Sequence, residues 1–125
     1  MDQEKFSIVK RLKSFKYAFN GLRILIKEEH NARIHLFAAI GVVIAGFIFK
    51  ISLHEWIAVA IAIGLVFCSE IINSAIENLS DFVCPDKNER IKKIKDLAAA
   101  AVLVSALTAL VIGLLVFIPK IVALF

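Results

Sequence analysis

The residues best suited to chemistry lie together in the segment Glu70–Asp81, within otherwise apolar sequence. An α-helix turns by about 100° per residue, so five polar residues of this segment fall within one arc of about 100°. They form a polar stripe: Glu70, Asn73, Ser74, Glu77 and Asp81. A carboxylate inside a membrane span is unfavourable in lipid, and such residues usually face a bundle interior and mark function. The stripe is therefore the first candidate for a functional site.

The two glutamates of the stripe are predicted to lie at different depths. If the helix enters the membrane at Trp56, a rise of about 1.5 Å per residue places Glu70 about 21 Å along, in the inner third of a hydrocarbon core about 30 Å thick. Glu77 then lies about 10 Å further on, at the membrane surface. Glu70 is thus placed to act as a general base on a lipid hydroxyl. Glu77 is placed where water and soluble anions can reach it.

Two further charged clusters are predicted on the same side of the membrane. They are Glu28, Glu29, Arg33 and His35 at the entry to the first apolar run, and Lys92, Lys93, Lys95 and Asp96 just before the last. Mg²⁺ prefers one or two carboxylates plus phosphate oxygens, so these clusters suit a magnesium-bound polyphosphate. The pattern predicts phosphoryl transfer from a soluble nucleotide to a lipid alcohol. Three alternatives remain at this point: a structural polar network, a small ion-coupled transporter, and a non-catalytic membrane scaffold.

Composition shows which elements must position these residues. The chain has 125 residues, of which 60% are hydrophobic, and a mean hydropathy of +0.84. An ordinary soluble domain is roughly 45–50% apolar, so that class is excluded. The length predicts a single membrane-embedded domain over residues 1–125, without a separate soluble catalytic domain. The net charge of +4 could indicate nucleic acid as a partner, but the hydropathy favours an anionic membrane surface.

The apolar runs predict an all-α integral membrane protein with three spans, at about residues 33–50, 55–79 and 96–118. Thirteen basic residues lie before the first span or in the loop 81–96, against Lys50 and Lys120 at the other ends. The positive-inside rule therefore puts the N-terminus in the cytoplasm. Residues 6–28 carry apolar side chains three and four apart, which predicts an amphipathic helix lying in the membrane interface or packing on a partner protein.

The polar stripe resembles the signature of the prokaryotic diacylglycerol kinase family, which includes the undecaprenol kinases. The matching positions, in order, are Glu70, Asn73, Ser74, Ala75, Ile76, Glu77 and Asp81. Ser80 departs from the Val or Ile that the family prefers. Further family positions lie along nearly the whole chain, at Tyr17, Gly21–Arg23, Glu29, Arg33, Lys95–Asp96 and the alanine run up to Val102.

This resemblance implies a homotrimer in the bacterial inner membrane, with active sites shared between subunits near the cytoplasmic face. It implies that Glu70 is the general base, with Asn73 beside it, and that Glu29 and Glu77 hold Mg²⁺ on the phosphates of ATP. The remaining nucleotide contacts would be Lys10, Tyr17, Lys95 and Asp96.

The acceptor lipid is the least determined part of this interpretation. Segments at 13–17, 33–35, 52–56 and 112–120 are closer to the undecaprenol kinase branch, so undecaprenol is favoured and diacylglycerol is the alternative. Both lipids present a primary alcohol on a long apolar body, and the same base, metal and nucleotide site would serve either of them.

Overall fold

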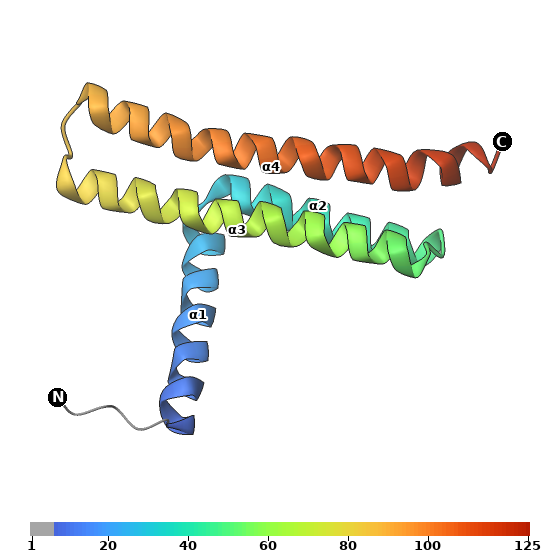
Figure 1. Cartoon of the computed structure of the whole chain (residues 1–125), viewed down its shortest axis with the longest axis horizontal. Helices are drawn as coiled ribbons and strands as arrows, with labels where there is room; N and C mark the ends of the chain where they lie inside the picture. Colours follow the sequence, from blue (N-terminus) through green and yellow to red (C-terminus); the bar gives the residue numbers. More distant parts are fainter. Residues whose placement is uncertain (1–6) are drawn as a thin grey trace.

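Three long helices run antiparallel as a bundle, and a shorter helix projects from its side (Figure 1). The computed structural model describes residues 7–125, in the order α1 (Ile8–Glu28), α2 (His30–Ile48), α3 (Leu53–Val83) and α4 (Glu89–Val122). These residues contain no β-strand. α2, α3 and α4 are each long and apolar enough to cross a membrane. The prediction of an all-α chain with three candidate spans is therefore confirmed.

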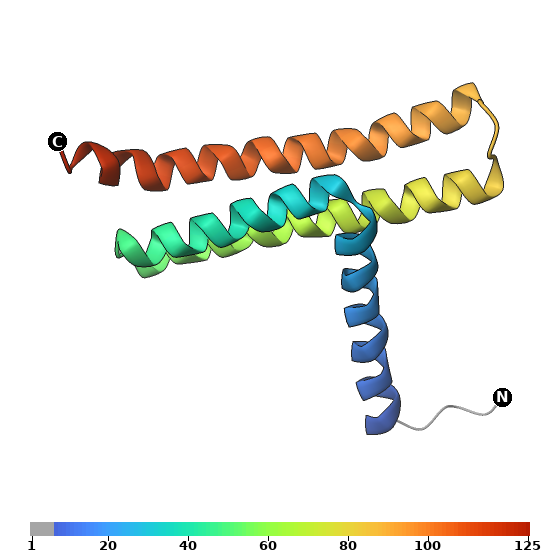
Figure 2. The ribbon, with the colours of Figure 1, turned by 180° about the vertical axis from the view of Figure 1, so that it is seen from behind.

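The central helix of the bundle is α3. It packs along α4 and also against α2, whereas the backbones of α2 and α4 hardly approach each other. The reverse view shows α2 lying along one half of α3 only, because α3 and α4 both continue past the start of α2 (Figure 2). We call the end with the α1–α2 junction and the α3–α4 loop the polar end. The far end carries the turn between α2 and α3 and the C-terminus.

Local sequence explains where the helices begin and end. Ser52 and Glu55 form a capping box at the start of α3, and the Asn88 side chain accepts hydrogen bonds from two backbone N–H groups at the start of α4. Cys84 is non-helical, with φ −145 and ψ 89, because it precedes Pro85, which disfavours helical backbone, and α3 ends there. Lys50 closes α2 with a left-handed backbone at φ 52, while Ile51 N–H bonds the carbonyl of Gly46.

The helices are longer than the predicted spans. α3 continues to Val83, and α4 begins at Glu89, well before the predicted start at 96. α4 also continues past Pro119 to Val122, because a proline near a helix end removes only one backbone hydrogen bond. The spans were estimated from apolar runs, whereas helices continue into polar sequence wherever caps allow. Of the predicted surface helix, residue 6 lies outside the described residues.

The far end holds the apolar core of the bundle. Ile51, Val59 and Val116 are buried there, from the α2–α3 turn, α3 and α4. Gly46 allows the Trp56 ring to approach closely, since a Cβ at Gly46 would lie 2.6 Å from that ring. An ion pair of 3.0 Å between Lys120 Nζ and Glu55 Oε1 joins α4 to the start of α3. The helices are thus fixed to one another at the far end.

α1 leaves the polar end crosswise to the bundle (Figure 1). Within α1 only Leu25 is buried, and α1 contacts both α2 and α3. The apolar side chains predicted to face a membrane or a partner remain exposed along α1, among them Leu12, Phe15 and Phe19. If the bundle crosses a membrane, a helix in this direction can lie along the surface, in the manner of an interfacial helix.

Candidate active site

The predicted polar stripe forms one face of α3 at the polar end. Glu70 and Ser74 are buried, Asn73 and Glu77 are half-buried, and Asp81 is exposed near the end of the helix. Because these residues are three or four apart, they follow one another along the helix surface. The stripe therefore leads from a buried carboxylate outwards to water.

Glu70 is the deepest member of the stripe, with 2% of its surface exposed. Its Oε1 lies 3.2 Å from Nε2 of His35 on α2, yet it accepts no hydrogen bond from any described residue. Oδ1 of Asn73 is likewise buried without a hydrogen-bond partner in the described chain. Buried polar atoms in proteins are nearly always hydrogen-bonded. Oδ1 of Asn73 is therefore suited to a donor on a bound molecule, and Oε1 of Glu70 is suited to a donor from His35 or from a bound molecule.

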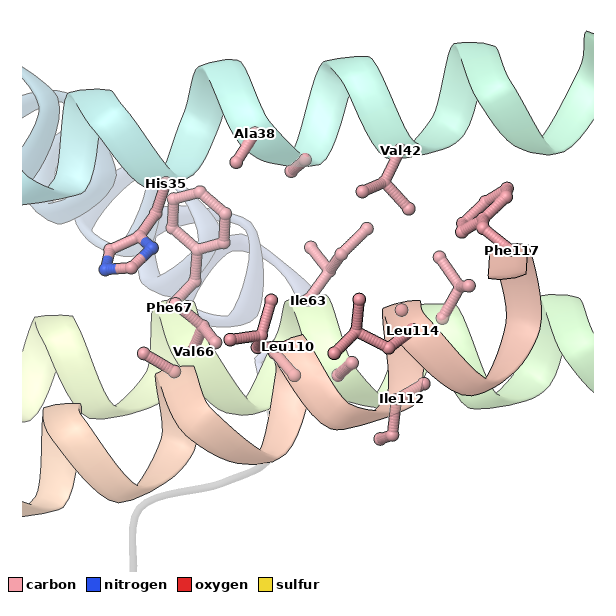
Figure 3. A pocket seen from close by; sticks show the side chains of 16 residues that line it. His35, Ala38, Val42, Ile63, Val66, Phe67, Leu110, Ile112, Leu114 and Phe117 are labelled. Carbon is pink, nitrogen blue, oxygen red and sulfur yellow. The ribbon is translucent and has the colours of Figure 1, made fainter. Parts of the chain in front are cut away.

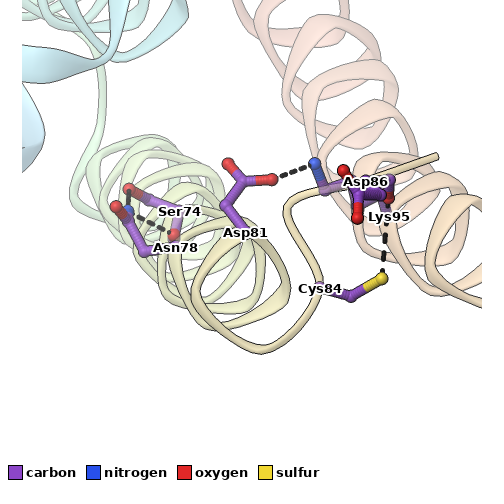
Figure 4. A network of polar contacts seen from close by, with 6 residues as sticks. All are labelled: Ser74, Asn78, Asp81, Cys84, Asp86 and Lys95. Carbon is purple, nitrogen blue, oxygen red and sulfur yellow. Dashed lines mark hydrogen bonds and ion pairs between the residues drawn. The ribbon is translucent and has the colours of Figure 1, made fainter. Parts of the chain in front are cut away.

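Glu29 meets the stripe because the helical backbone breaks at this residue. It is extended, with φ −102 and ψ 113, and it ends α1 and precedes α2. Its Oε1 accepts a hydrogen bond of 3.1 Å from Oγ of Ser74 on α3. Asn78, also on α3, donates to the Ser74 carbonyl at 2.8 Å (Figure 4). Ser74 therefore connects Glu29 at the α1–α2 junction with Asn78 on α3. The α1–α2 junction is thereby fixed at the depth of Ser74.

The charges at the polar end form a connected group. Glu29 and Glu77 both interact electrostatically with Glu70, and Glu77 also interacts with Lys95 on α4. Lys95 Nζ makes an ion pair with Asp81, across the gap between α3 and α4 (Figure 4). Two carboxylates, Glu29 and Glu77, thus lie within electrostatic range of Glu70 at the polar end. A cation bound among them would relieve their mutual repulsion.

The two predicted magnesium ligands, Glu29 and Glu77, belong to this group. Within residues 7–125 no three His, Cys, Asp or Glu side chains gather closely enough to hold a metal by themselves. Mg²⁺ is usually bound by one or two carboxylates together with substrate phosphates and water, so two carboxylates are enough ligands from the protein. The residues present therefore fit Mg²⁺ that arrives with a polyphosphate.

The other predicted nucleotide contacts are distributed over α1 and α4. Asp96 pairs with Lys92 at 2.7 Å on an exposed face of α4. Tyr17 is 70% exposed on α1. Tyr17 lies eleven positions before the end of α1, or about 16 Å of helix, and Lys10 lies further out still. One chain therefore does not bring Lys10 and Tyr17 to the carboxylate group, and their role as nucleotide contacts stays a prediction.

An apolar cavity of about 390 Å³ lies between α2 and α4, over α3 (Figure 3). Small side chains on all three helices keep it open, among them Ala38, Ala62 and Ala109. His35 lies at one end of the cavity and Phe117 at the other (Figure 3). Its size and apolar walls are typical of a small-molecule site. Since His35 also contacts Glu70, the cavity ends beside the buried carboxylate.

Sequence reasoning missed two contacts of this site. The sequence places His35 in a charged cluster without predicting its contact with Glu70, and it predicts no partner for Ser74. The signal for His35 was a lone imidazole inside an apolar run, six residues after Glu29. No sequence signal indicated that Ser74 would bind Glu29, because the two residues are 45 positions apart.

Comparison with known proteins gives consistent results over most of the chain. Residues 16–117 match the family model described as prokaryotic diacylglycerol kinase. The chain is 39% identical over 108 residues to the undecaprenol kinase of Bacillus subtilis, covering 86% of this chain and 88% of that protein. It is 31% identical over 114 residues to a diacylglycerol kinase of a Synechocystis strain, covering 90% of this chain and 65% of that protein.

Proposed function

The chain belongs to the prokaryotic diacylglycerol kinase family, and from that premise we propose that it is a lipid kinase that transfers the γ-phosphate of ATP to the primary hydroxyl of undecaprenol. The observation that carries this proposal is Glu70, a buried carboxylate beside one end of an apolar cavity. A lipid alcohol needs these two features together, an apolar surface for its body and an acceptor for its hydroxyl proton. The product is undecaprenyl phosphate.

In the reaction we propose, Glu70 accepts the proton of the lipid hydroxyl. As this proton leaves, the hydroxyl oxygen forms a bond to the γ-phosphorus, and the bond between that phosphorus and the β–γ bridging oxygen breaks. The electron pair of the broken bond stays on ADP. A positioned general base typically contributes 10²–10⁴-fold to such a step. Asn73, one helical turn further along α3, has a buried oxygen free to accept a hydrogen bond from the bound substrates.

Glu29 and Glu77 would hold Mg²⁺ on the phosphates of ATP. The ion supplies charge neutralisation at the β- and γ-phosphate oxygens. The hydrogen bond from Ser74 orients one of these carboxylates before the nucleotide arrives. Lys95, which pairs with Asp81 in this structure and interacts electrostatically with Glu77, would exchange its partner for a phosphate oxygen. Asp96 would complete the polar site on α4.

The apolar cavity would hold the part of the lipid chain next to the hydroxyl. At about 390 Å³ it can enclose only the first segment of a polyprenol, and the rest would lie in the bilayer. Undecaprenol is favoured over diacylglycerol because the Bacillus relative, which this chain matches over most of both lengths, bears that name. Diacylglycerol also presents a primary alcohol, so it is the second acceptor to test.

We further propose that the protein is a homotrimer in the bacterial inner membrane, with the polar end in the cytoplasm. The basic residues before α2 and around the α3–α4 loop support this orientation. The exposed apolar face of α1 supports its placement in the membrane interface. The separation of Lys10 and Tyr17 from Glu70 within one chain supports sites that are shared between subunits.

The test is transfer of labelled γ-phosphate from ATP, with Mg²⁺, to undecaprenol and to diacylglycerol in parallel mixed micelles. We expect faster labelling of undecaprenol. A preference for diacylglycerol would assign the enzyme to the other branch of the family. No labelling of either lipid by folded protein would refute the kinase proposal. It would favour the alternative of an ion-coupled transporter with Glu70 as its ion site.

A further inference from the structure

His35 is a polar residue of the bundle to which the proposed function gives no role. It lies on α2 and its side chain is 25% exposed, in a wall that is otherwise apolar. Its Nε2 is 3.2 Å from Oε1 of Glu70, a side chain with 2% exposure. A buried carboxylate that must stay ionised requires a donor or a positive charge nearby. The contact between His35 and Glu70 therefore indicates a polar role for His35 in addition to packing.

Among the groups around Glu70, His35 differs from the others in its effect on the carboxylate. Of the described groups that act on Glu70 electrostatically, Glu29 and Glu77 repel its negative charge and only His35 attracts it. Oε1 of Glu70 has no hydrogen-bond partner among the described residues, although Nε2 of His35 is within hydrogen-bond distance. The two atoms are close enough for a hydrogen bond, and only the orientation of the N–H is missing. His35 is thus the group placed to hold the carboxylate in one orientation.

His35 also connects Glu70 to the apolar cavity. The imidazole lines one end of the cavity (Figure 3), and its Nε2 contacts Oε1 of Glu70. We propose that His35 is a positioning residue that fixes Oε1 of Glu70 by donating from Nε2, so that Oε2 faces the hydroxyl of the lipid in the cavity. This inference rests on the proposed lipid kinase function. His35 keeps its proton throughout, and the hydroxyl proton moves to Glu70 alone.

Because His35 only donates in this scheme, a side chain with a donor at the same reach can replace it. The His35→Gln variant places an amide N–H near the position of Nε2, whereas His35→Asn is too short and His35→Leu has no donor. We expect His35→Leu and His35→Asn to lower kcat by about 10- to 100-fold, the effect of losing a hydrogen bond to a charged group. His35→Gln should keep kcat within about threefold of the unmodified protein, in line with retention of that hydrogen bond. The KM for ATP should stay unchanged in all three.

The control is His54, an exposed residue in the first turn of α3 at the far end. We expect His54→Gln and His54→Leu to match the unmodified protein in kcat and both KM values. If His35→Asn and His35→Leu retain full kcat, the positioning role is wrong. If His35→Gln loses as much as His35→Leu, an amide donor does not suffice, and the scheme in which His35 only donates is overturned.

A second measurement detects the contact between His35 and Glu70 without using the reaction. The chain has three histidines, so ¹⁵N-histidine labelling gives few side-chain signals, and His35→Gln assigns one set by its loss. We expect the Nε2 signal of His35 to move in Glu70→Gln and to stay in place in Glu28→Gln, which alters an exposed neighbour at the polar end. An unmoved signal in Glu70→Gln would overturn the proposal. Unmodified protein that phosphorylates neither lipid would refute the proposed function and the catalytic role together, while a moved signal would still establish the contact.

Discussion

Replacing Glu70 by Gln isolates the basicity of this side chain from its shape. The side chain is buried and contacts His35, and a Gln of nearly equal size keeps an oxygen that can accept from the imidazole. Glu29, Glu77 and Lys95, which would bind the nucleotide, remain as they are. The change therefore removes the proton acceptor and leaves the binding groups intact.

The expected effect follows from the size of general-base catalysis, which is 10²–10⁴-fold. We expect kcat to fall by roughly 10²-fold or more, equivalent to about 2.7 kcal/mol of transition-state stabilisation. The KM for ATP should change by less than about twofold, because a group that acts only on the reacting proton leaves ground-state binding intact. The melting temperature should not fall, since the neutral amide relieves the desolvation of a buried charge, which is the largest effect on Glu70, and offsets the lost attraction from His35.

The assay is the rate of lipid phosphorylation over a range of ATP concentrations at saturating lipid and Mg²⁺. Glu28→Gln is the matched control, because it removes one carboxylate from an exposed position at the same end of the molecule. We expect it to leave kcat and KM unchanged. A Glu70→Gln variant that keeps its kcat, or that loses ATP affinity to the same extent as kcat, would refute the assignment of Glu70 as the base.

Three further predictions concern the metal, the lipid and the fold. Glu77→Gln should raise the KM for ATP and shift the magnesium titration to higher concentration, and an unchanged titration would remove Glu77 from the metal site. Ala109→Leu fills part of the apolar cavity and should raise the KM for lipid by roughly tenfold, as expected for about 1–3 kcal/mol of lost apolar fit, while a normal lipid KM would show that the chain binds elsewhere. Gly46→Ala places a Cβ 2.6 Å from the Trp56 ring and should lower the stability in detergent by roughly 1–3 kcal/mol, whereas Gly41→Ala, which meets nothing within 4 Å, should have no such effect on thermal unfolding.

The amino-acid sequence was sufficient to predict the helices and the candidate catalytic face. Apolar runs near the length of a membrane span predicted three long helices, and the spacing of Glu70, Ser74 and Glu77 predicted one polar face on the second of them. Both predictions depend on local periodicity, which is a property of the chain itself. The positions of the helix ends were less well predicted, because caps such as Asn88 extend a helix beyond its apolar run.

The tertiary structure decided which residues of different helices meet. It brought Glu29 to Ser74 and His35 to Glu70, and it opened an apolar cavity between α2 and α4 at the second of these contacts. It also turned α1 crosswise, away from the carboxylates (Figure 1). These features depend on how three helices pack around α3. The periodicity of one helix does not predict how a neighbouring helix is rotated about its axis or shifted along it. The chemistry of each residue could therefore be predicted from the sequence, and the partner of each residue was decided by packing.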